Sequence, residues 1–413
     1  MELRHHAVGN GYFLVSPGNT KSPRYAQEDS MTRVVVVGGG LAGVSAVRTL
    51  TRSETAVAVT LISDRPDMHF RPNIPDVIST TIPSRYLLTG LDTLAHRSGV
   101  RFLQDEAVGV DFDNCVVHPA GGSEIEFDYL IIAVGSRTNF HGNSSFEASA
   151  LTVDSVDAGV SIAEAIRTGT PRRYVISGGG YTGMEAAAHI RAALRRRREQ
   201  RDILVVELSN TILPGLPDWM KHYTRKNLRA MNIDVVTGTS VKEIDEGRVV
   251  LSDGSRLDDA LVVWSAGMKA APLAARLGLP TGAQGRITTG PDLRVRENCF
   301  AAGDVACTGT GTACPRMSVQ ASIGGGATAA RNVLRLIDGR PTRKFKLIDP
   351  GLIIPMANGR SCGTALGHPV KGMTATFLHY FMSAYRSIGI RNTLGVASSA
   401  ARAVPRMLLS SRR

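Results

Sequence analysis

The 413-residue chain has no uninterrupted apolar run of about 18 residues, and its N-terminus has no basic segment leading into an apolar core. The first absence argues against a membrane-spanning helix and the second against a secretory signal. The five cysteines form no C-x-x-C pair and have no metal-ligand spacing, which argues against a disulfide framework and a metal site. We therefore expect a cytoplasmic protein without bound metal.

Acidic residues are absent from the segment 350–413, which nevertheless carries eight of the basic residues behind the net charge of +12. A predicted helix in this segment presents an apolar stripe at three- and four-residue spacing, formed by Met373, Phe377, Phe381, Tyr385 and Ile388. Three interpretations stay open: the stripe lies on an anionic membrane, at the inner face of the cell membrane, or it packs on the protein's own core, or it joins two subunits in a homodimer.

Two further segments are unusual in composition: residues 1–30 and the run from Arg195 to Arg198. Residues 1–30 mix His, Gly, Pro, Ser and Asn without periodicity, which predicts a disordered leader or an upstream start with Met31 as the working start. Four consecutive arginines, Arg195 to Arg198, fall at the end of a predicted helix, where they favour the negative end of the helix dipole. We interpret them as a solvated helix end and expect no nucleic-acid partner.

A β-α-β pattern begins at Arg33. Four valines, Val34 to Val37, read as a buried parallel strand. The loop Gly38-Gly39-Gly40-Leu41-Ala42-Gly43 follows, and a helix and a second β-branched strand come after it. This G-x-G-x-x-G pattern between a strand and a helix predicts a dinucleotide site in which backbone N–H groups hold the pyrophosphate. The acid expected about 20 residues later for the ribose is Asp64, with Ser63 just before it.

The same design recurs about 140 residues later as Gly178-Gly179-Gly180-Tyr181-Thr182-Gly183. Its next strand ends at Glu207, whose carboxylate would accept hydrogen bonds from the ribose hydroxyls and repel a 2′-phosphate. This copy therefore favours NADH over NADPH. Two copies, each with a downstream polar residue, predict two nucleotide domains of one design.

Three more strings identify a resemblance: Phe127 to Ser136 (FDYLIIAVGS), Val262 to Gly267 (VVWSAG) and Cys299 to Asp304 (CFAAGD). With the two loops, they make the chain similar to the two-dinucleotide-binding-domain flavoproteins of the FAD/NAD(P)-dependent pyridine nucleotide-disulfide oxidoreductase superfamily. Within it, the chain looks most like the type II NADH:quinone oxidoreductases. The resemblance assigns FAD to the first loop and NADH to the second.

The resemblance implies an α/β fold with two Rossmann-like domains, the NAD domain inserted in the FAD domain. We place the FAD-binding domain at 31–150 and 268–345, the NAD(H)-binding domain at 151–267, and a small C-terminal acceptor, membrane or dimer segment at 346–413. Cofactor binding is assigned to Gly38, Gly40, Leu41, Ala42, Gly43, Ser63, Asp64, Arg71, Val108, Ala133, Gly135, Gly303, Asp304, Gly178, Gly180, Tyr181, Thr182, Gly183, Glu207 and Gly267.

Two residues are assigned catalytic roles by the resemblance. Glu185 extends the second loop to G-x-G-x-x-G-x-E and would lie beside flavin, NADH and acceptor, although a helix first-turn acid explains it as well. Gln320 retains the first amide of the family's quinone motif. The motif's later Gln pair is replaced by Gly324 and Gly325, which predicts a wider acceptor space with fewer hydrogen-bond partners.

The predicted function is that of an FAD-dependent NADH dehydrogenase: hydride passes from NADH to FAD, and electrons then pass to a quinone or another small acceptor. One alternative is an NAD(P)H reductase that delivers electrons to a protein redox partner in a biosynthetic pathway. The other is a flavoprotein that senses NADH without turnover.

Overall fold

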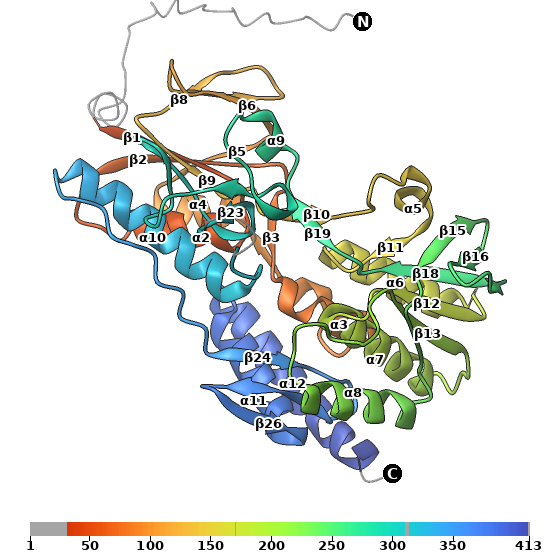
Figure 1. Ribbon diagram of the computed structural model, residues 1–413. Helices are drawn as coiled ribbons and strands as arrows, with labels where there is room; N and C mark the ends of the chain where they lie inside the picture. The colour runs from red at the N-terminus through yellow and green to blue at the C-terminus, as the bar shows by residue number, and fades with distance from the viewer. Residues whose placement is uncertain (1–30, 170, 310–313, 412–413) are drawn as a thin grey trace, which may run out of the picture.

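The computed structural model describes residues 31–169, 171–309 and 314–411 (Figure 1), so the predicted leader lies outside the described residues. Its largest sheet has six strands in the order β21-β22-β9-β1-β2-β5, and β1 pairs in parallel with both β2 and β9. The strands are β1 (Thr32–Val37), β2 (Val57–Ser63), β5 (Arg101–Gln104), β9 (Tyr129–Ile132), β21 (Arg294–Arg296) and β22 (Cys299–Ala301).

The strand β1 contains four consecutive valines because both faces of this sheet are covered by other elements. Val34 and Val36 pack in a core with α2 (Leu41–Leu50) and α10 (Val319–Ile337), whereas Val35 and Val37 pack in a second core with the strands β6 to β8. A strand buried on both faces has no position for polar side chains. Those covering strands are β6 (Ala107–Asp111), β7 (Val116–Pro119) and β8 (Ile125–Glu126).

A second parallel sheet has the order β11-β18-β12-β13-β14. Its strands are β11 (Leu151–Thr152), β12 (Arg173–Ser177), β13 (Asp202–Glu207), β14 (Asp234–Thr237) and β18 (Ala260–Trp264), and its main helices are α6 (Val156–Thr168), α7 (Tyr181–Arg196) and α8 (Asp218–Ala230). The chain leaves the first sheet through β10 (Ser136–Thr138) and returns through β19 (Met268–Ala270), which pair antiparallel. The second nucleotide fold is thus inserted in the first.

Shorter elements complete the two units. Around the first sheet lie β3 (Asp67–His69), β4 (Leu88–Gly90), α4 (Leu91–Ser98), α9 (Leu273–Arg276), β20 (Ile287–Thr288) and β23 (Ala306–Cys307), whereas α3 (Ile74–Ile78) packs against α6 and α7 of the second unit. Near the second lie α5 (Ser144–Ser149), β15 (Val241–Asp245), β16 (Arg248–Leu251) and β17 (Arg256–Leu257). Phe146 of α5 packs on Trp264, so α5 contacts the second sheet although it precedes β11.

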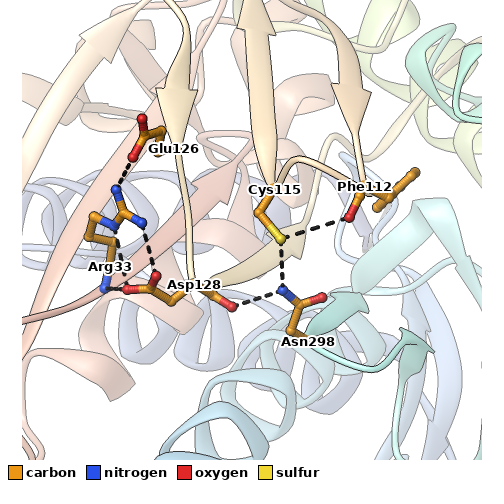
Figure 2. A network of polar contacts seen from close by, with 6 residues as sticks. All are labelled: Arg33, Phe112, Cys115, Glu126, Asp128 and Asn298. Carbon is orange, nitrogen blue, oxygen red and sulfur yellow. Dashed lines mark hydrogen bonds and ion pairs between the residues drawn. The ribbon is translucent and has the colours of Figure 1, made fainter.

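A polar network joins distant parts of the first unit (Figure 2). Asp128, just before β9, accepts a hydrogen bond from the Arg33 backbone and forms an ion pair of 3.0 Å with its guanidinium. The Asn298 side chain donates to the Asp128 carbonyl at 2.9 Å. These contacts hold the start of β1 beside the segment that returns after the inserted unit.

The C-terminal segment connects both units. It contains β24 (Gly351–Ile354), β25 (Ser361–Ala365), β26 (His368–Lys371), α11 (Gly372–Arg386) and α12 (Ile390–Ser411). Ile354 and Cys362 pack in the core of the second unit, while Tyr380 and Val396 pack with Ile74 of α3. No helix among the described residues is both long and apolar enough to cross a membrane.

The cysteines and the apolar stripe of the C-terminal segment were both the subject of predictions from sequence. Cys307 and Cys314 form a disulfide, contrary to the expectation from spacing, because their Cα atoms lie only 5.0 Å apart, within the range that a disulfide spans. The helix α11 forms as predicted, and Phe377, Phe381 and Tyr385 are 64%, 55% and 75% exposed, so these three do not pack on the protein's own core. Ile388, the last member of the stripe, does pack against the first core.

The arginine run lies at the end of α7, as predicted, but part of it is engaged. Arg196 donates to the Ser79 carbonyl and to Thr81 Oγ1, and Arg197 donates to the Arg167 carbonyl. These arginines therefore hold neighbouring loops and do not form a free basic patch.

Candidate functional site

Both glycine loops have the backbone geometry of a phosphate-binding turn. A Cβ added at Gly43 would lie 1.8 Å from the Gly38 carbonyl oxygen, and one at Gly183 would lie 2.0 Å from that of Gly178. Only glycine allows the helix to approach its strand this closely. A Cβ at Gly40 or Gly180 would meet open space, which leaves room for a pyrophosphate above each helix N-terminus.

The strands that follow the two loops, β2 and β13, end at equivalent positions in the two units. The Gly38 nitrogen donates to the Ile62 carbonyl, and the Gly178 nitrogen donates to that of Val206. Ser63 therefore occupies the place that Glu207 occupies in the second unit. Asp64 lies one position further along and forms an ion pair of 3.0 Å with Arg137.

Glu207 is held in place by the backbone around it. Its Oε2 accepts from the Gly179 nitrogen at 2.5 Å, and its Oε1 accepts from the Ser209 nitrogen at 2.7 Å. The side chain is 8% exposed. A carboxylate fixed at this end of the strand is oriented to bind ribose hydroxyls beside the second loop.

A first cavity runs along the first loop. It contains many of the predicted residues, and it is lined among others by Gly38, Gly40, Leu41, Ala42, Ser63, Asp64, Arg71, Ala133, Gly135 and Asp304. Val108 is not among its lining residues, although its neighbours Glu106 and Ala107 are. Gly43 and Gly303 shape it from behind, since a Cβ at Gly303 would lie 2.8 Å from the Ala42 side chain.

Asp304 lies where this cavity meets a second one. Ser136 Oγ donates to its Oδ2 at 2.8 Å, and Ser322 Oγ is 3.4 Å from its Oδ1. Arg71 in turn donates to the Ser136 carbonyl at 3.2 Å. Both cavities are lined by Asp304, Arg71 and Ser136. A ligand that contacts these three residues is therefore accessible from either cavity.

The second cavity encloses about 580 Å³, within the usual range of about 300–1,000 Å³ for ligand sites. It brings together Tyr181, Thr182 and Glu185 from the second loop and its helix, Gln320 from α10, and Gly267. Its remaining walls are mostly apolar, and sequence reasoning assigned none of them: Phe70, Pro72, Pro75, Val153, Trp264, Met268, Met317, Val319, Leu352, Ile353, Leu378 and Met382.

Glu185 is a carboxylic acid at this cavity wall. Burial, with a smaller contribution from the negative charge of Asp76, raises the pKa of Glu185 well above its ordinary value. This shift favours the protonated form of the carboxyl group, which can donate a hydrogen bond to a ligand.

Polar residues that sequence reasoning missed also face the cavities. Asp154 lines both and accepts from Thr138 at 2.7 Å and from Thr152 at 2.8 Å. Burial favours its neutral form, but these two hydrogen bonds outweigh it and hold the pKa of Asp154 below its ordinary value. Arg316, His379 and Arg386 also line the second cavity. None of these residues belongs to a local motif.

The prediction about Gly324 and Gly325 is not supported by their positions. Neither residue lines a cavity described above. A Cβ at Gly324 would approach the Phe345 ring at 3.4 Å, and one at Gly325 the Gly303 nitrogen at 3.4 Å. Gln320, one helical turn earlier, does face the cavity and lies 3.4 Å from the Gly351 carbonyl.

Among the described residues, no group of three or more His, Cys, Asp or Glu side chains could hold a metal ion.

Comparison with known proteins agrees with this geometry. The sequence profile of the pyridine nucleotide-disulphide oxidoreductase family matches residues 32–330. A demethylphylloquinone reductase of Synechocystis sp. is 25% identical over 378 residues, which cover 87% of this chain and 93% of that protein. A type II NADH:quinone oxidoreductase of Staphylococcus saprophyticus is 22% identical over 376 residues, covering 84% and 92% of the two chains.

Two solved structures have the same fold. NDH2 from Plasmodium falciparum in complex with NADH has a TM-score of 0.81 at 16% identity and covers 90% of this chain and 98% of its own. The sulfide:quinone oxidoreductase of Aquifex aeolicus has a TM-score of 0.75 at 18% identity and covers 88% of this chain and 92% of its own.

Proposed function

This chain belongs to the pyridine nucleotide-disulphide oxidoreductase family, and from that premise we propose that it is an FAD-dependent NADH dehydrogenase that reduces a quinone. One observation carries the proposal. The second cavity is lined by Tyr181 and Thr182 of the NADH loop, by Asp304 of the FAD site, and by an apolar wall that matches a quinone ring. Donor, cofactor and acceptor can meet in this one space.

Each part of the site has a role in binding or positioning. Gly40 and Gly180 leave room for the two pyrophosphates, and Glu207 orients the NADH ribose. FAD, when bound, supplies the capacity to take a hydride from NADH and to pass electrons onward. Glu185 and Gln320 offer hydrogen bonds to a ligand, while Phe70, Leu352 and Met382 exclude water from it.

The test is a reduction cycle on purified protein. We expect a yellow protein whose flavin absorbance bleaches anaerobically with NADH and returns when a water-soluble naphthoquinone is added. A protein that cannot be loaded with FAD would refute the proposal. A protein reduced once by NADH that no quinone reoxidises would point to a sensor, and reoxidation by a protein carrier alone would point to a reductase of a redox partner.

We also infer that the outer face of α11 and α12 binds an anionic membrane surface. Phe377, Phe381 and Tyr385 project from α11, and Ile390 and Leu394 of α12 are 80% and 62% exposed. Exposed apolar side chains beside arginines, with no acidic residue in 350–413, are typical of a helix that lies at the lipid interface. A second copy of the chain on this face is the alternative outcome of the test given in the Discussion.

The position of α11 supports a link between this face and the acceptor. Leu378 and Met382 line the second cavity, whereas Phe377 and Phe381, each one residue earlier, project outward. One helix therefore separates the proposed lipid surface from the acceptor cavity. A lipid-soluble quinone would have a short path from a membrane into the site.

A further inference from the structure

A buried carboxylate lies directly behind the acceptor cavity. Asp76 of α3 is fully buried. Tyr380 Oη donates to its Oδ1 at 2.7 Å, and Asn73 Nδ2 donates to its Oδ2 at 2.9 Å. A buried carboxylate with two donors is a well-formed acceptor for a third.

His379 stands between this carboxylate and the cavity. Its Nε2 is 3.9 Å from Asp76 Oδ2 and 3.2 Å from Asn73 Nδ2, and its side chain is 10% exposed. His379 lines the second cavity, and its Nδ1 has no hydrogen bond to any described residue. The ring thus has a carboxylate 3.9 Å from one nitrogen and borders the cavity that an acceptor would occupy.

The charges around Asp76 favour its anionic form. Burial alone would raise its pKa, but the charge that His189 gains in acid, together with His379 and the Asn73 amide, holds the pKa of Asp76 below its ordinary value. The other titratable groups facing it are Tyr380 of α11 and Glu185, His189 and Arg196 of α7. Burial lowers the pKa of His189 to about 4, so His189 is neutral at pH 7.

Quinone reduction by NADH needs a proton from the protein side. NADH delivers a hydride, which is two electrons and one proton, but the hydroquinone carries two added protons. One proton per turnover must therefore come from solvent through a group in the cavity wall. Of the groups facing Asp76, His379 is the basic side chain that lines this cavity.

We propose, on the basis of the function proposed above, that His379 donates this proton to the acceptor and that Asp76 is its positioning residue. The Nδ1–H bond of the His379 imidazolium breaks as an O–H bond forms on the acceptor oxygen, and the electron pair stays on the imidazole. Asp76 stabilises the imidazolium before transfer, and solvent returns a proton to His379 afterwards.

The test compares acceptors that differ in their need for protons. A water-soluble naphthoquinone takes two electrons and two protons, whereas ferricyanide takes electrons only. In His379→Gln, we expect the ratio of the quinone rate to the ferricyanide rate at pH 7 to fall roughly 10²-fold, the lower limit for loss of a general acid. The decline of the quinone rate toward high pH should also disappear. His368→Gln, on the exposed strand β26, is the matched control and should leave both unchanged.

A second measurement does not depend on turnover. In the flavin-loaded protein with ¹⁵N-labelled histidine, the His379 imidazole signals are assigned by their absence in His379→Gln. We expect these signals to change in chemical shift in Asp76→Asn at pH 7, because the neighbouring anion is lost. Tyr380→Phe, which removes one donor to Asp76 and keeps its charge, serves if Asp76→Asn does not fold, and should also change these chemical shifts because Asp76 then interacts more strongly with the His379 ring.

The outcomes separate this inference from the proposed function. Wild-type protein that oxidises NADH with ferricyanide but reduces no quinone would overturn both. Quinone turnover with the same rate ratio and pH profile in His379→Gln and His368→Gln would overturn only the donor role of His379. His379 imidazole signals that are the same in wild type and in the folded variants at Asp76 and Tyr380 would overturn the positioning role of Asp76.

Discussion

Tyr380 of α11 donates a hydrogen bond of 2.7 Å to the buried carboxylate of Asp76 in α3, across 304 positions of sequence. This contact attaches the C-terminal segment to the first nucleotide unit, beside the acceptor cavity. Removing the segment from Gly372 onward would therefore expose a core that includes Ile74, so its roles are better tested by point substitutions.

The first prediction concerns the stability of this attachment. Tyr380→Phe should lower the free energy of unfolding by about 1.5–3 kcal/mol, the range for a hydrogen bond to a charged group. Tyr385→Phe on the same helix is the control, because Tyr385 is 75% exposed and its loss of a hydroxyl should change stability little. Urea unfolding of both variants measures the difference, and equal midpoints would contradict the prediction.

The second prediction concerns acid and His189. Its pKa is lowered from 6.5 to about 4 by burial, so between these values the unfolded chain binds a proton that the folded protein does not. Stability from this group is therefore lost as pH falls, by about 2 kcal/mol between pH 7 and pH 5. Glu185, whose pKa is raised, acts with the opposite sign in this window.

The comparison that isolates His189 is with His189→Gln. Glu185 is present in both proteins, so its contribution largely cancels. Asp76 and Asp154 have lowered pKa values, and their stabilisation is lost only as pH falls through those values, below this window. We expect the stability difference between wild type and His189→Gln to shrink by about 2 kcal/mol from pH 7 to pH 5. A difference that is independent of pH would show that His189 is protonated in the folded protein.

The third prediction concerns coenzyme choice. Glu207→Gln keeps the size of the side chain but removes the charge that repels a 2′-phosphate. We expect kcat/KM for NADH to fall roughly 10-fold or more, as for loss of a charged hydrogen bond, with a smaller fall for NADPH. Glu243→Gln, exposed in the same unit, controls for charge. An unchanged NADH to NADPH ratio would mean that another residue recognises the ribose.

The fourth prediction concerns the membrane face. Phe377→Ser together with Phe381→Ser should reduce binding to vesicles containing anionic lipid at least about 10-fold, because burying each aromatic side chain contributes roughly 1.5–3 kcal/mol. Binding of the wild type should weaken with salt. Val160→Ser on α6, at another partly exposed apolar site, is the control. Unchanged vesicle binding, with a loss of dimer in sedimentation, would assign the face to a second copy.

The two nucleotide units could be predicted because their signals are local. The loops from Gly38 and from Gly178 each combine a buried strand, a close helix approach and a polar residue at the next strand end, all within about 30 residues. The choice between Ser63 and Asp64 was less certain, because a count along the sequence does not include strand register. Only pairing of β1 with β2 shows that Ser63 is equivalent to Glu207.

The acceptor side was harder to predict for a different reason. Comparison of motifs predicts that Gly324 and Gly325 widen the acceptor space, but the phase of α10 turns them toward Phe345 and Gly303. The apolar residues of α11 were predicted to form one stripe. Leu378 and Met382, which lie next to stripe residues in the sequence, face the cavity because of the way α11 packs on the protein. The helical period alone does not specify this packing.

The α/β class, the duplicated dinucleotide fold and the family could all be inferred from the sequence alone, because they follow from short-range patterns of strand, loop and helix. The packing of distant segments, in contrast, placed Asp76 behind the cavity wall that His379 and Glu185 line, joined the two cavities at Asp304, and left Phe377 exposed. These relations connect residues hundreds of positions apart, and they arise from the packing of the C-terminal segment against both units.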